Sequence, residues 1–235
     1  MTKRIWELDA LRGICILGMV AVHIGYDLGS LGYGTASPLF LFVQNWGGTL
    51  FLVLSGVCVT LGSHHLRRGL LVFGCGMLCT LVTLSLYLLG LAGSELIIYF
   101  GVLHCLGTCM LLWSLFSRLP GTILSVLACL FSAVGLRLMQ AAPVTVPWLI
   151  PLGFQFPGFA SSDYFPLLPN LGYFLFGTLL GRNLYRIPVT RLPKINPHGQ
   201  PIRFLCLCGR HSLPIYLLHQ PLIAAILAVA TPFFS

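Results

Sequence analysis

The chain opens with the sequence RIWELDALRGICILGMVAVHIGYDL, residues 4–28. Its central run from Leu11 to Ile24 is apolar apart from Arg12 and His23, and it is long enough for a helix that crosses a bilayer. No small-residue cleavage site follows, so we interpret it as an uncleaved first span over residues 7–28 and not as a signal peptide. Ionisable groups are costly in lipid, so Arg12 and His23 make this span the first place to look for a function.

The composition extends this interpretation to the whole chain. Of its 235 residues, 57% are hydrophobic and 8% are charged, whereas an average soluble domain has roughly 25% charged residues. The net charge of +8 comes from 13 basic and 5 acidic residues, too few for the basic face of a nucleic-acid-binding protein. Long apolar runs argue against a β-barrel, whose strands alternate. We therefore expect an all-α, polytopic transmembrane helix bundle that forms one domain over residues 1–235.

Hydropathy predicts about seven spans of near twenty residues each. They cover residues 7–28, 38–62, 69–91, 96–116, 122–139, 168–184 and 204–230. Lysine and arginine concentrate in alternate connections, as they do in cytoplasmic loops. All basic residues except Arg137 and Arg210 then lie on one side, which predicts that the N-terminus is inside and the C-terminus outside.

Four ionisable residues follow one side of the first span: Asp9, Arg12, His23 and Asp27. Arg12 and His23 are eleven residues apart, which is three helical turns and about 16 Å. Asp27 is one turn beyond His23 on the same side. An imidazole can take a proton near neutral pH, and a carboxylate beside it can fix its tautomer. The plainer interpretation is that His23 hydrogen-bonds a neighbouring helix and that Asp27 is a solvated helix end.

Two further histidines, His104 and His219, fall at a similar predicted depth in the bilayer, so that three imidazoles from three helices can converge. No two of the three lie on one helix at the spacing of metal ligands, so no metal is expected. The nine cysteines lie in or at the edges of apolar runs. They predict buried thiols and no disulfide framework.

The first span resembles the opening of the heparan-alpha-glucosaminide N-acetyltransferase catalytic-domain family, and the spacing of Arg12 and His23 is similar to that in integral-membrane O-acyltransferases. Four more stretches are similar to the acetyltransferase family, so the resemblance covers most of the chain. They are NWGGTLFLVLSGVCVTLG at 45–62, YFGVLHCLG at 99–107, DYFPLLPNLGYFLFGTLLGR at 163–182 and GRHSLPIYLLHQPLI at 209–223. Lysosomal members use a histidine in the loop after the first span, and residues 29–38 contain none. This departure favours His23 as the catalytic histidine.

The resemblance implies a minimal bacterial-type enzyme of the cytoplasmic membrane that moves an acetyl or other acyl group from acetyl-CoA to a sugar or related hydroxyl or amine acceptor across the bilayer. His23 would be the general base and Asp27 would orient it, while Asp9 and Arg12 would bind the acetyl-CoA donor. The expected acceptor-binding residues are His104, Asp163, Asn170, His219 and Gln220. The expected partners are the acyl-CoA, a glycan-like acceptor and the lipid bilayer, with no nucleic acid, and a homodimer stays open.

Two other classes of function remain open at this point. A transporter or flippase would use the same polar side of the first span as a substrate path, with His23 and Asp27 as a proton relay. The two halves of the chain show no repeat and seven helices are few for alternating access, which disfavours this class. A structural or partner-binding membrane protein would leave Arg12 and His23 unexplained.

Overall fold

A computed structural model of the chain describes residues 5–30, 37–141, 143–196 and 199–230. These residues form eight α-helices and two short 3-10 helices, η1 (Ser94–Leu96) and η2 (Pro147–Leu152). The described part contains no β-strand beyond one isolated bridge between Phe100 and Tyr164. The predicted all-helical class is confirmed.

Five of the described helices are long and apolar enough to cross a membrane. They are α1 (Trp6–Ser30), α2 (Pro38–Leu61), α3 (His65–Leu88), α5 (Gly121–Met139) and α8 (Ser212–Ala230). Helix α4 (Val102–Phe116) is apolar but shorter, and α6 (Leu167–Leu184) has 18 residues. The chain is thus an integral membrane protein by its helices, while the count of seven spans and the orientation stay predictions.

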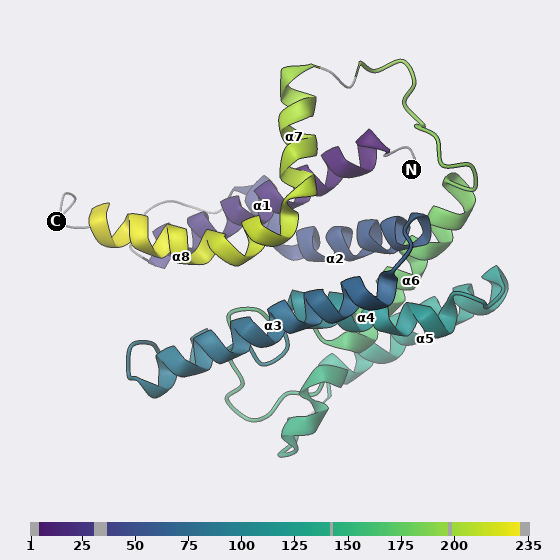
Figure 1. Cartoon of the computed structure of the whole chain (residues 1–235). Coiled ribbons are helices and arrows are strands. Elements are labelled where there is room, and N and C mark those ends of the chain that lie inside the picture. Colours follow the sequence, from purple (N-terminus) through teal and green to yellow (C-terminus); the bar gives the residue numbers. More distant parts are fainter. Residues whose placement is uncertain (1–4, 31–36, 142, 197–198, 231–235) are drawn as a thin grey trace. The chain divides into compact units, whose positions relative to one another are not determined.

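Two of the predicted spans have the wrong limits. The fourth, predicted over residues 96–116, becomes helical only at Val102, because residues before it are extended and the backbone N–H of Phe165 donates to the carbonyl oxygen of Phe100 at 2.9 Å. The seventh, predicted as one helix over 204–230, is broken at His211 into α7 (Gln200–Arg210) and α8. Figure 1 shows α7 at a steep angle to α8, so the break changes the direction of the chain.

Contacts between residues divide the chain into two units. The first unit combines residues 1–51 with 188–235, and the second is residues 52–187. Helix α2 begins in the first unit and ends in the second. Each unit is described by itself below, and the single domain over 1–235 stays a prediction.

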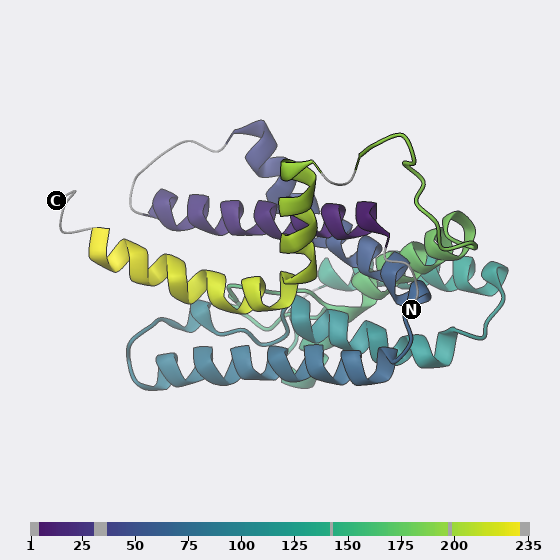
Figure 2. The ribbon, with the colours of Figure 1, turned by 45° about the horizontal axis from the view of Figure 1, so that its top comes forward.

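In the first unit, α1 packs against α7, α8 and the beginning of α2. Helices α1 and α8 run side by side (Figure 2). Helices α1 and α7 approach closely enough for their backbones to touch: a Cβ atom on Gly13 would collide with the carbonyl of Leu205, and one on Gly209 with the carbonyl of Asp9. Small residues permit such close helix contacts in membranes, where packing replaces the hydrophobic effect.

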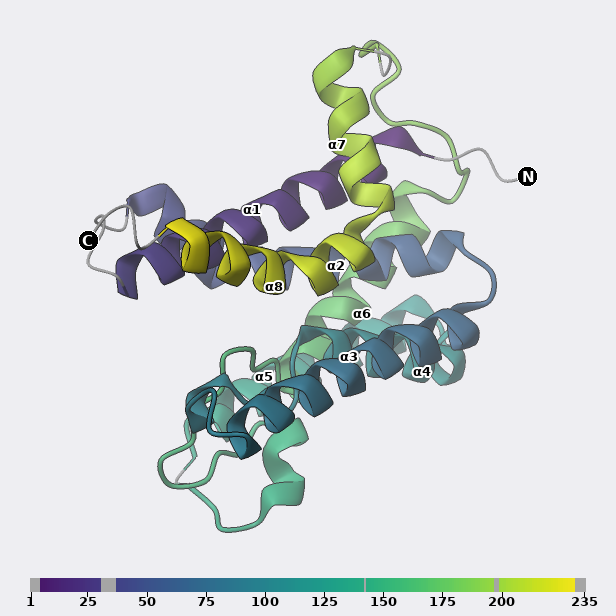
Figure 3. The same ribbon diagram turned by 60° about the vertical axis from the view of Figure 1, so that its left-hand side comes forward.

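In the second unit, α3 packs against α4 and α5 against α6 (Figure 3). The α3–α4 pair is antiparallel, because Gly69 faces Leu111 and Gly76 faces His104. Glycines again set the distance: a Cβ atom on Gly107 would lie 2.6 Å from the backbone nitrogen of Phe73. The last turns of α2 pack on α6 in the same way, through Gly56 and Gly177.

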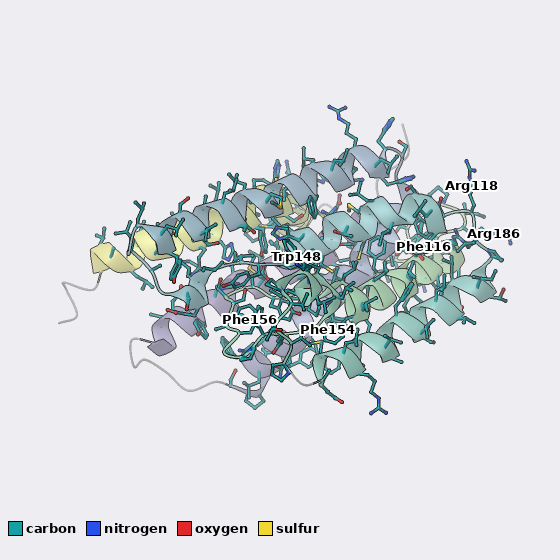
Figure 4. All side chains as sticks on the ribbon, turned by 90° about the horizontal axis from the view of Figure 1, so that it is seen from below. Phe116, Arg118, Trp148, Phe154, Phe156 and Arg186 are labelled. Atoms are coloured by element: carbon teal, nitrogen blue, oxygen red, sulfur yellow. The ribbon has the colours of Figure 1, made fainter. Side chains whose placement is uncertain are left out.

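Figure 4 labels two groups of residues in the second unit. Phe116, Arg118 and Arg186 lie together at one end, while Trp148, Phe154 and Phe156 lie away from it, in the connection between α5 and α6. Trp148 is 85% exposed. Basic residues at one membrane surface and aromatic residues at the interface are typical of spanning proteins.

Candidate functional site

The predicted polar side of α1 faces α8 within the first unit. His23 of α1 and His219 of α8 contact each other, with ring centroids 4.8 Å apart and ring planes at 58°. His23 is partly exposed and His219 is buried. The structure therefore brings together two of the three histidines that the sequence singled out.

The hydrogen bond between the His219 ring and a backbone carbonyl defines the tautomer of His219. Its Nδ1 atom lies 2.5 Å from the carbonyl oxygen of Tyr216. A carbonyl oxygen only accepts hydrogen bonds, so Nδ1 carries the proton and the Nε2 atom of the neutral ring holds a lone pair. That Nε2 atom is buried and has no hydrogen-bond partner within the described part of the chain. It is available to accept a proton or a hydrogen bond from a bound molecule.

Gln220 and Asp27 form the next contact between α8 and α1. The Gln220 amide donates from Nε2 to Oδ2 of Asp27 at 3.2 Å. Its Oε1 atom is buried, and no partner for it lies among the described residues. Asp27, predicted to orient His23, thus engages Gln220, and the structure places both beside the histidine pair.

Nearer the N-terminal half of α1, Arg12 reaches the first residue of α8. Its Nη2 atom donates to the Ser212 hydroxyl at 2.9 Å, and Ser212 is buried. The Nε–H of Arg12 is buried without a hydrogen-bond acceptor in the described chain. An orphaned donor on a guanidinium suits a phosphate or carbonyl oxygen.

Asp9 and Arg12 are three residues apart on α1, but they form no ion pair with each other in the described part of the chain. Asp9 instead accepts from Nε of Arg210 at 3.1 Å, across from α7. The close approach of Gly209 to the backbone of Asp9 brings the neighbouring Arg210 within reach. Because Asp9 pairs with Arg210, the Arg12 guanidinium bonds to Ser212, and its Nε–H can donate to a bound molecule.

Sequence reasoning missed two residues that shape the site. Glu7 is buried, and its carboxylate accepts from the hydroxyl of Thr190 at 2.9 Å and from the backbone N–H of Arg191 at 2.7 Å. It thereby ties the connection before α7 to the start of α1. Ser212 was the second, and its only signal was its place directly after Arg210 and His211.

The remaining predicted site residues lie in the second unit. His104 is buried with both ring nitrogens engaged: the backbone N–H of Gly101 donates to Nδ1 at 3.2 Å, and Nε2 lies 3.3 Å from the Thr80 hydroxyl. Asp163 accepts from the backbone N–H of Val102 at 3.0 Å, which caps the first turn of α4. Asn170 is buried and donates to the carbonyl of Pro166 at 2.7 Å. Each of the three supports local structure, and their role in acceptor binding stays a prediction.

Metal-binding side chains do not gather in the described residues: no group of three or more histidine, cysteine, aspartate or glutamate residues has the geometry to hold an ion. All nine cysteines are free thiols. The first unit places imidazole, carboxylate, amide and guanidinium groups between its helices.

The fold and site define a class of protein, an all-helical integral membrane protein with imidazole, carboxylate and guanidinium groups between its helices. The sequence profile of the heparan-alpha-glucosaminide N-acetyltransferase catalytic domain matches residues 4–221. Because this match covers most of the chain, the protein belongs to that family, and its class of activity is that of a membrane acetyltransferase. Searches of curated proteins and of solved structures found no match.

Proposed function

We propose that the protein transfers an acetyl group from acetyl-CoA to a hydroxyl or amine of a sugar-like acceptor, and that the α1–α8 face of the first unit holds the reacting groups. The observation behind this proposal is the buried Nε2 atom of His219, which has no hydrogen-bond partner among the described residues and belongs to a ring that contacts the ring of His23. An unpartnered imidazole nitrogen at a buried site suits general-base catalysis.

The donor side of the proposal rests on Arg12. Its buried Nε–H has no acceptor in the described residues, and its Nη2 is oriented by Ser212. Both features fit the phosphate or pantetheine carbonyl oxygens of a CoA thioester. Arg12 and His23 are eleven residues apart on one helix, about 16 Å, and an extended pantetheine arm spans such a distance. Asp9, the other predicted donor-binding residue, would act through its ion pair with Arg210, which holds α7 against α1.

The chemistry follows from these positions. Acetyl-CoA supplies the acetyl group as a thioester. The Nε2 atom of His219 takes the proton of the acceptor O–H or N–H as the new C–O or C–N bond forms. The C–S bond then breaks, and His219 returns the proton to the leaving thiolate, which releases CoA and the acetylated acceptor. The Tyr216 carbonyl fixes the ring and its tautomer throughout.

His23 is the residue that the sequence predicts as the base. Its ring contacts the ring of His219, and it lies on α1 four residues before Asp27. The two histidines can share the role of general base by passing the proton between them. Substituting each histidine alone distinguishes their contributions to the rate. The membrane orientation with the N-terminus inside and a bacterial cytoplasmic membrane belong to the same proposal. Basic residues at one end of the second unit support the orientation (Figure 4).

A transporter would use the same residues as a proton relay and would need no CoA. The two proposals differ in donor binding, which Arg12→Lys tests because lysine keeps the charge but loses the planar fork of donors. We expect CoA to raise the thermal stability of the purified protein, and Arg12→Lys to weaken CoA binding roughly tenfold or more. Gln200→Met, on an exposed position of α7, is the control. A wild-type protein that millimolar CoA does not stabilise would contradict the acetyltransferase proposal and favour the transporter.

A further inference from the structure

The α1–α8 face contains two buried polar atoms that are both hydrogen-bond acceptors. They are Nε2 of His219 and Oε1 of Gln220, and neither has a partner within the described residues. A buried acceptor that stays unsatisfied loses the hydrogen bonds it would make in water, which destabilises the protein. Two on adjacent residues of one helix indicate that a bound molecule completes the site.

The acceptor character of both atoms is fixed by their neighbours. The Tyr216 carbonyl accepts from His219 Nδ1, which leaves Nε2 as the lone-pair atom. The Asp27 carboxylate accepts from Gln220 Nε2, so the amide cannot rotate without losing this bond, and Oε1 faces the site. A molecule that satisfies both atoms must therefore bring two hydrogen-bond donors.

The two acceptors also lie at successive levels along the same pair of helices. His219 contacts His23, and Gln220 contacts Asp27. His23 and Asp27 are four residues apart on α1, about one helical turn. At a separation of about one helical turn, we expect one small molecule to reach both atoms.

We infer that Gln220 determines acceptor specificity: its Oε1 atom accepts a hydrogen bond from a second hydroxyl or amino group that lies next to the group acetylated at His219. Asp27 is a positioning residue for the Gln220 amide. The inference rests on the proposed acetyltransferase function for the identity of the reaction, but the subsite itself is defined by the two acceptors. The ligand class is an amine or alcohol that carries an adjacent donor, as a vicinal amino alcohol does.

The test compares two amine probes that differ only by one hydroxyl group, trans-2-aminocyclohexanol and cyclohexylamine. The purified protein receives acetyl-CoA, and acetylated amine is measured by mass spectrometry. Binding of each probe without acetyl-CoA is measured by thermal shift. We expect the wild-type protein to prefer the amino alcohol by roughly 10- to 100-fold in kcat/KM, the ratio that corresponds to one buried acceptor satisfied or left unpaired.

Gln220→Met removes the amide and keeps the length of the side chain, and it should bring the ratio of the two kcat/KM values close to one. Asp27→Asn should lower the ratio to an intermediate value, because the amide orientation is no longer fixed, whereas a purely structural role of Asp27 would lower both rates equally. Gln200→Met is the matched control and should keep the wild-type ratio, since Gln200 is exposed on α7.

The outcomes separate the inference from the proposed function. Equal preference for the two probes in the wild-type protein, or an unchanged ratio in Gln220→Met, would overturn the inference even if acetyl transfer is robust. If no acetyl transfer occurs but the amino alcohol alone stabilises the wild-type protein and not Gln220→Met, the subsite is supported and the acetyltransferase proposal fails. Equal stabilisation by both probes would overturn the subsite without any need for activity.

Discussion

The rings of His23 and His219 contact each other with centroids 4.8 Å apart, and they come from two helices that are each long enough to cross a membrane. Two imidazoles at this distance share one local environment and can exchange a proton through a bound hydroxyl or water. Their contact depends on the packing of α1 against α7 and α8.

The first prediction concerns the α1–α7 crossing. Gly13→Ala should lower the free energy of unfolding by about 1–3 kcal/mol, because the added methyl group would collide with the Leu205 carbonyl. Gly29→Ala, on the same helix, is the control, since a Cβ atom there meets nothing within 4 Å. It should be neutral or stabilising by up to about 1 kcal/mol. Thermal unfolding of both variants in detergent measures the difference, and equal behaviour would show that the crossing is not tight.

The second prediction concerns Tyr164 in the connection before α6. Its hydroxyl donates to the carbonyl of Ile150 at 2.8 Å, and burial raises the pKa of Tyr164 to about 12. Tyr164→Phe should lower the free energy of unfolding by about 1 kcal/mol at neutral pH, because the carbonyl loses its donor.

The pH dependence of that variant follows from the direction of the shift. The protonated hydroxyl is favoured in the folded protein, so its contribution is complete below pH 10, the ordinary pKa of tyrosine, and is lost as the pH rises to about 12. The difference between the wild type and Tyr164→Phe should therefore narrow over this range. A difference that stays constant up to pH 12 would contradict the assigned hydrogen bond.

Hydropathy predicted most helix limits to within a few residues, because span length and apolar character are properties of the local sequence. The predicted helix limits were wrong where contacts with residues distant in the sequence determine where a helix begins or ends. The start of α4 at Val102 depends on the Asp163 carboxylate, which comes from 61 positions further along. The break at His211 accompanies the approach of Gly209 to Asp9 and the bond of Arg12 to Ser212, and neither contact has a periodic signal.

The site shows the same division. The placement of Asp9, Arg12, His23 and Asp27 on one side of a helix follows from its period alone. The helical period does not predict which partner each of these residues has. Asp9 pairs with Arg210 of α7 because α1 and α7 touch at Gly209. The tautomer of His219 depends on a backbone carbonyl that becomes available only in the folded α8. Such hydrogen bonds cannot be predicted from residue type or spacing.

The third prediction concerns membrane orientation. Cysteine introduced at Ser162, which is exposed in the connection before α6, should react with a membrane-impermeant maleimide applied to spheroplasts, because the predicted topology places it outside. Cysteine at Lys194, exposed before α7, should react only after permeabilisation. The parent protein, with its nine native thiols, supplies the baseline. The reverse pattern would invert the predicted donor and acceptor sides.

Acetyl transfer from radiolabelled acetyl-CoA to trans-2-aminocyclohexanol, measured for the purified wild type, His219→Ala and His23→Ala, shows directly whether His219 is the base. We expect transfer by the wild type and a loss of rate of roughly 10²- to 10⁴-fold in His219→Ala, with CoA binding retained, because the base is removed and the donor site at Arg12 is not. The transfer rate of His23→Ala should fall less than that of His219→Ala if His219 alone is the base. It should fall as much if the two histidines share the proton. Full-rate transfer by His219→Ala, or a wild-type protein that neither transfers the label nor releases CoA, would contradict this proposal.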